Sequence, residues 1–77
     1  MSKVFVGVTV RHSKQGQITP LIMHWHDGRQ WPVDRVMDVR QAASQIAGGL
    51  GTRYICRIAG KQVYLFHDED KWFIEGK

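Results

Sequence analysis

Apolar and polar side chains alternate along much of the chain with a period of two. The clearest stretch is residues 3–12, where every second residue from Val4 to Val10 is valine. A strand places successive side chains on opposite faces, and β-branched residues favour it. The pattern therefore predicts a strand over residues 3–12. Weaker alternation predicts five more strands, over residues 18–26, 29–39, 54–58, 63–66 and 72–75.

The connections between these strands have the composition of hairpin turns. Asp27-Gly28 gives the strongest signal, because this pair between two strand-like runs is typical of a tight hairpin. Residues 13–17, 59–62 and 67–71 are predicted as further turns. Val36 breaks the alternation of its strand, and a break of phase indicates a bulge or bend there.

One segment has a different character. Residues 40–47 are rich in alanine and glutamine, and Gly48, Gly49 and Gly51 follow. This composition predicts about two turns of helix, stopped by glycine. A phosphate-binding loop is the alternative interpretation of the glycines, but the GxxxxGK[ST] string is missing.

Together these elements predict a mainly β fold. We expect residues 1–77 to form a single small β domain, either a small antiparallel six-stranded curled sheet or an SH3-like or OB-like barrel, with one short helical turn. Closure is how short all-β chains remove exposed strand edges.

Charge and cysteine content narrow the functional classes. Eleven Lys and Arg against seven Asp and Glu give a net charge of +4, which leaves anionic partners open. The single cysteine, Cys56, cannot form an internal disulfide, so we expect a reducing compartment, the cytoplasm. No signal peptide and no apolar run long enough to span a membrane is recognised, so no membrane partner is expected.

Two binding functions fit these features. The first hypothesis is a non-catalytic interaction module that binds a protein partner through a sheet edge or exposed aromatic side chains, as a monomer or weak homodimer. The alternative is a nucleic-acid-binding module, since arginine suits phosphate and exposed rings stack on bases. The candidate residues for the second function are Arg29, Arg35, Arg53, Arg57, Trp25, Trp31 and Tyr54.

Catalysis and metal binding receive less support. His24 and His26 are two residues apart, so a strand would turn both to the same face, but two ligands do not complete a metal site. Cys56 shares its parity with Tyr54 and Ile58, which favours a core position over a nucleophile. No catalytic string is present, so we expect neither an enzyme nor a cofactor.

Several strings spread over the chain also carry a family resemblance. They are residues 25–29 (WHDGR), residues 33–40 (VDRVMDVR), Ala42-Ala43-Ser44, the glycines of residues 48–51, Arg53-Tyr54 and Trp72-Phe73. This pattern resembles a family of very short, uncharacterised proteins of Gram-positive bacteria. The resemblance implies a small cytosolic β-rich protein with no assigned reaction, and its relatives near DNA-repair polymerases favour a link to nucleic acid.

Overall fold

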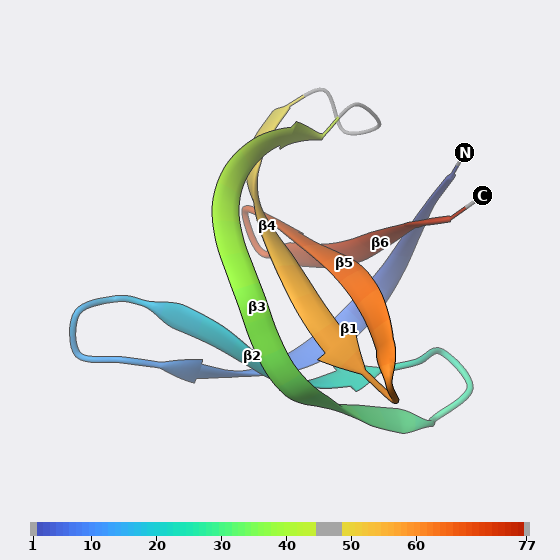
Figure 1. Ribbon diagram of the computed structural model, residues 1–77. Coiled ribbons are helices and arrows are strands. Elements are labelled where there is room, and N and C mark those ends of the chain that lie inside the picture. Colours follow the sequence, from blue (N-terminus) through green and yellow to red (C-terminus); the bar gives the residue numbers. More distant parts are fainter. Residues whose placement is uncertain (1, 45–48, 77) are drawn as a thin grey trace.

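Six antiparallel strands close into a barrel in the computed structural model, which describes residues 2–44 and 49–76 (Figure 1). Each strand pairs with its neighbours in sequence and β6 pairs with β1, which is an up-and-down order. All six predicted strands and the antiparallel barrel are confirmed. The strands are β1 (Ser2–His12), β2 (Ile18–His24), β3 (Gln30–Ser44), β4 (Gly49–Ile58), β5 (Lys61–Asp68) and β6 (Lys71–Gly76).

The prediction of a short helical turn is wrong for the residues that the structure describes. β3 continues as a strand to Ser44, and β4 already begins at Gly49, so Gly49 and Gly51 do not stop a helix. The β3–β4 ladder runs without a break from Asp38 to Ser44, which satisfies the backbone across the strands. Because a two-turn helix is costly to nucleate, this pairing overrides the local preference. Residues 45–48 lie outside the described residues.

The first two hairpins share one loop design. In each, the residue that opens the loop accepts a hydrogen bond from a glycine three residues later, at 3.0 Å for both Gly16 and Gly28. These glycines have φ of 85° and 91°, a conformation that favours glycine. The predicted hairpin at Asp27-Gly28 is confirmed, and His26 belongs to its loop rather than to β2.

Two register shifts bend β3 around the barrel. One lies between Val33 and Arg35 and the other between Val36 and Asp38, so that Asp34 and Met37 have no register partner on β4. The predicted irregularity near Val36 is thereby confirmed. Each extra residue restores the inward direction of the next apolar side chain and increases the local twist.

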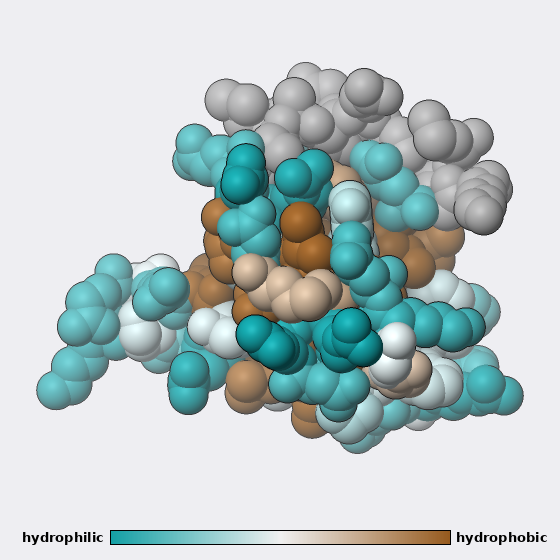
Figure 2. Space-filling view, viewed as in Figure 1, coloured by the Kyte–Doolittle hydropathy of each residue, from teal (hydrophilic) through white to brown (hydrophobic). Residues whose placement is uncertain are grey.

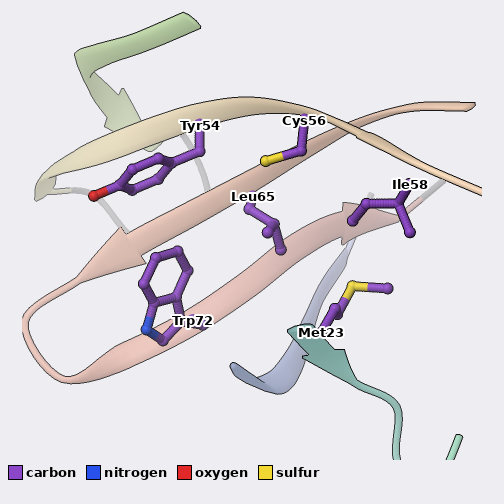
Figure 3. Close-up of a cluster of buried hydrophobic side chains, with 6 residues drawn as sticks. All are labelled: Met23, Tyr54, Cys56, Ile58, Leu65 and Trp72. Atoms are coloured by element: carbon purple, nitrogen blue, oxygen red, sulfur yellow. The ribbon is translucent and has the colours of Figure 1, made fainter. Parts of the chain in front are cut away.

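The barrel interior holds a cluster of buried side chains (Figure 3). β4 contributes three side chains to this cluster, and β2, β5 and β6 contribute one each, all pointing toward one another. Cys56 and Leu65 at its centre are completely buried. The members are Met23, Tyr54, Cys56, Ile58, Leu65 and Trp72.

The hairpin of β1 and β2 extends beyond the barrel wall as an arm, which we define as residues 7–21 (Figure 1). β1 pairs with β6 only as far as Val6, and β2 pairs with β3 only from Ile22. Within the arm, β1 and β2 therefore pair only with each other. The Tyr54 hydroxyl donates a 3.0 Å hydrogen bond to the Ile18 carbonyl and ties the arm to β4. In Figure 2 the projecting part of the arm is mostly hydrophilic.

No helix among the described residues is long and apolar enough to cross a membrane.

Candidate nucleic-acid interface

The outward side chains of β3, β4 and β5 form a basic surface, which we call the arginine face. Residues directly opposite each other on antiparallel strands point to the same side of a sheet. Tyr54, Cys56 and Ile58 on β4 are buried in the barrel, so the alternate residues of β4 and their register partners lie on the outer side of the sheet. The outward set is Arg35, Asp38 and Arg40 on β3, Arg53, Ile55 and Arg57 on β4, and Gln62, Tyr64 and Phe66 on β5, of which Phe66 is buried.

Two pairs of arginines lie directly opposite each other on this face. Arg35 is the register partner of Arg57, and Arg40 is the register partner of Arg53. Like charges in directly opposite positions destabilise a sheet by up to about 1 kcal/mol for each pair. An anion that contacts both members of a pair would remove this repulsion, so the arrangement favours binding of a polyanion.

Tyr64 supplies an exposed ring beside the arginines. It is 42% exposed and lies opposite Ile55 on β4. The Gln62 amide donates a 3.2 Å hydrogen bond to the Tyr64 hydroxyl, and the Arg53 guanidinium lies 5.4 Å from the ring centroid. These two contacts hold the ring in place on the sheet surface. An exposed ring held next to cations is the arrangement that binds single-stranded nucleic acid through stacking and phosphate contacts.

The acidic side chains on β3 neutralise only part of the positive charge. Asp38 accepts a 2.7 Å hydrogen bond from Nε of Arg40, in an ion pair whose arginine side chain stays 69% exposed. Asp34, the extra residue of the first bulge, is exposed and forms no ion pair with any described residue. Nε of Arg53 is buried without a hydrogen-bond partner among the described residues. Four guanidinium groups thus face one outward carboxylate.

The structure brings three of the four predicted arginines together and separates the fourth. Arg35, Arg53 and Arg57 lie on the arginine face. Arg29 lies in the β2–β3 turn, where its Nε is 3.1 Å from the Asp27 carboxylate. Asp27 also accepts a 3.0 Å hydrogen bond from the Arg29 backbone, so the charge of Arg29 is already paired at the turn.

None of the three predicted aromatic residues belongs to the arginine face. Tyr54 is 5% exposed inside the barrel, where its ring lies 5.3 Å from that of Trp72. Trp31 lies opposite the buried Met23, and Trp31 and Trp25 are both half-buried against the core. These rings stabilise the barrel because a chain of this size needs most of its aromatic surface for its own interior.

The histidines and the cysteine show no arrangement typical of a reactive site. His24 hydrogen-bonds to the Thr9 hydroxyl at 2.6 Å, whereas His26 lies in the loop with its ring next to Trp25. The strand argument for a shared face therefore fails at His26. Among the described residues, no group of three His, Cys, Asp or Glu is arranged to hold a metal ion. Burial raises the pKa of the Cys56 thiol to about 11, which keeps it protonated at neutral pH.

The sequence interpretation did not include Arg40 and Tyr64 among the candidate residues. Arg40 opens the segment whose composition predicts a helical turn, and this composition conceals its place on a strand. On β5, Gln62, Tyr64 and Phe66 are alternate residues and therefore point to the same side of the sheet. Only the register with β4 shows that this is the outer side at Tyr64. The strand alternation after residue 60 was the available signal for Tyr64.

Comparisons with known proteins found no match among protein-family models, curated proteins or solved structures. The resemblance to the Gram-positive family stays a prediction.

Proposed function

We propose that this protein is a non-catalytic, cytoplasmic module that binds single-stranded nucleic acid through the arginine face. One observation carries the proposal: two pairs of arginines lie directly opposite each other on neighbouring strands, next to the exposed Tyr64 ring. Phosphates would bind between the opposed guanidinium groups, and a base would stack on Tyr64. The resemblance to the Gram-positive family supports the same direction, and a role in DNA repair stays a prediction.

The experiment measures binding of a fluorescein-labelled oligo(dT) of about 12 nucleotides by fluorescence anisotropy, a length within the usual site sizes. We expect affinity to fall steeply between about 50 and 200 mM salt, because each phosphate contact releases counterions. Replacement of both exposed arginines, Arg35→Gln with Arg57→Gln, should weaken binding and lower the salt slope by about 1.4, at about 0.7 for each contact.

A matched control variant also removes two positive charges, but at a different place on the molecule. Arg11→Gln with Lys14→Gln removes two exposed cations from the arm, away from the arginine face. This double variant should retain most of the affinity for oligo(dT). Equal losses from the two double variants would show that only the net charge matters, and absence of binding at low salt would contradict the proposal.

The structure gives a second observation, which favours a protein partner. The predicted tryptophans are turned toward the core, so this hypothesis now rests on unpaired strand edges rather than on exposed indole rings. The arm provides such an edge on β1.

A further inference from the structure

The outer edge of β1 in the arm lacks a strand partner. From Val8 to His12, β1 pairs only with β2 among the described residues, since its pairing with β6 ends at Val6. Ser13 donates a 2.9 Å backbone hydrogen bond to Gln17, which closes the hairpin. Hydrogen-bonded pairs alternate along an antiparallel ladder, so Arg11 turns its amide toward Thr19. Val10 and His12 turn theirs outward.

The neighbouring free edges carry features that prevent strand addition, and this edge of β1 does not. On β2, Pro20 has no amide to donate, and the Ile18 carbonyl already accepts the Tyr54 hydroxyl. The free edge of β3 next to β2 is interrupted by two bulges between Val33 and Asp38. Bulges and prolines are the usual protection of an exposed strand edge. The β1 edge has no proline, and the one bulge in its hairpin leaves the extra residue on β2.

A hollow lies at the inner end of this edge. Its volume is about 380 Å³, and it lies where β6 begins at Lys71 and β1 continues alone beyond Val6. Apolar walls come from Phe5, Val8 and Trp72, and polar groups come from Asp70 and Lys71. Phe5 is 52% exposed there. The hollow is large enough for one aromatic side chain of a peptide that extends the sheet along β1.

The charges change along the edge. At the hollow, Asp70 and Lys71 offset each other, whereas at the tip of the arm Arg11 and Lys14 are both exposed cations without an ion pair among the described residues. A second copy of this chain would place two arms side by side that each carry Arg11 and Lys14 and no acidic residue. An acidic peptide instead meets complementary charge there.

We propose that the β1 edge binds an extended acidic peptide by strand addition, with an apolar anchor in the hollow and carboxylates beside Arg11 and Lys14. Antiparallel pairing is the slightly more stable arrangement, and it places the carboxyl end of the peptide at the hollow. The outward amides of Val10 and His12 donate hydrogen bonds to the peptide backbone. The hollow selects peptides that have an apolar side chain at the anchor position.

The test uses the full chain and a labelled, end-blocked peptide of sequence Thr-Glu-Thr-Glu-Thr-Phe. Val10→Pro removes an outward donor while leaving the β1–β2 hydrogen bonds, and it should weaken peptide binding about tenfold, or about 1.4 kcal/mol. Val10→Thr keeps the amide and should bind like the natural sequence. Arg11→Gln with Lys14→Gln should also weaken binding. Arg35→Gln with Arg57→Gln should leave it unchanged, which separates this proposal from the nucleic-acid proposal.

Amide hydrogen exchange on the unsubstituted protein gives a second measurement if Val10→Pro does not fold. The peptide should slow exchange at Val10 and His12, and a peptide with lysine in place of glutamate should not. The proposal is overturned if the acidic peptide does not bind, if it protects amides elsewhere, or if these two amides are already protected by dimerisation without peptide.

Discussion

The β4–β5 wall and the arm use the same strand pattern but differ in how their strands are covered. β4 is hydrogen-bonded along both edges, whereas β5 pairs with β4 from Lys61 to His67 and with β6 only from Phe66 to Asp68. Both strands turn one face to the core cluster, and the outward side chains of Arg57, Gln62 and Tyr64 are exposed and take no part in it. The arm is paired along one edge only. The wall can therefore tolerate the mutual repulsion of its directly opposed arginines. The arm, in contrast, leaves the backbone amides and carbonyls of its outer edge without a strand partner among the described residues. The two regions are suited to different ligands for this reason.

The largest expected effect is a difference in the free energy of unfolding between a substitution in the wall and one in the arm. Leu65 in the wall is completely buried, whereas Leu21 in the arm is 40% exposed. Leu65→Ala leaves a cavity in a packed core and should lower the free energy of unfolding by about 2–5 kcal/mol. Leu21→Ala should change it by less than about 0.5 kcal/mol. Urea denaturation measures both, and similar losses would contradict the distinction between wall and arm.

A second prediction concerns the alkaline limit of the wall. Burial raises the pKa of Cys56 from 9.0 to about 11, so the folded protein holds the thiol proton more tightly than the unfolded chain. The associated stability is fully present below pH 9.0 and should be lost as pH rises toward about 11, by about 1.4 kcal/mol for each pH unit.

Cys56→Ala provides the comparison for that pH dependence. Thermal denaturation from neutral pH to about 11 should show a smaller decline in the variant than in the natural sequence. Burial also raises the pKa of Tyr54, with a further contribution from the Cys56 charge, so some decline should remain. Parallel pH curves for the two proteins would refute the role of the thiol.

The attachment of the arm to the wall gives an intermediate effect. Tyr54→Phe removes the hydrogen bond to the Ile18 carbonyl and keeps the ring in the core. The loss should cost about 1 kcal/mol, and amide exchange should accelerate in the arm more than in β5. Equal acceleration in both regions would indicate that the hydroxyl stabilises the whole barrel rather than the attachment of the arm.

The sequence predicts the strands well because their alternation reflects one buried face over most of the barrel, although β5 and β6 also bury Phe66 and Phe73 on the other face. It does not predict which arginines meet. Arg35 and Arg40 are five residues apart, so a regular strand would turn them to opposite faces, and only the bulge at Met37 brings them to the same one. The burial of Tyr54 does follow from the sequence, because Tyr54 shares its parity with Cys56 and Ile58, and the prediction of Tyr54 as a base-stacking residue conflicts with that parity.

The smallest expected effect tests whether the arginine face trades stability for binding. Arg57→Glu changes the pair with Arg35 into one of opposite charge, which should raise the free energy of unfolding by about 0.2–1 kcal/mol at low salt. The same variant should bind oligo(dT) more weakly. An unchanged free energy of unfolding, or undiminished binding of oligo(dT), would show that the opposed arginines are not kept for an anionic ligand.

The most direct measurement is an NMR titration of the isotope-labelled protein with oligo(dT), followed through backbone and arginine side-chain signals. Saturable shifts should concentrate on Arg35, Arg53, Arg57 and Tyr64, with little change from residues 7 to 21. Shifts centred on the arm, or no saturable shifts at low salt, would contradict the assignment of nucleic-acid binding to the arginine face.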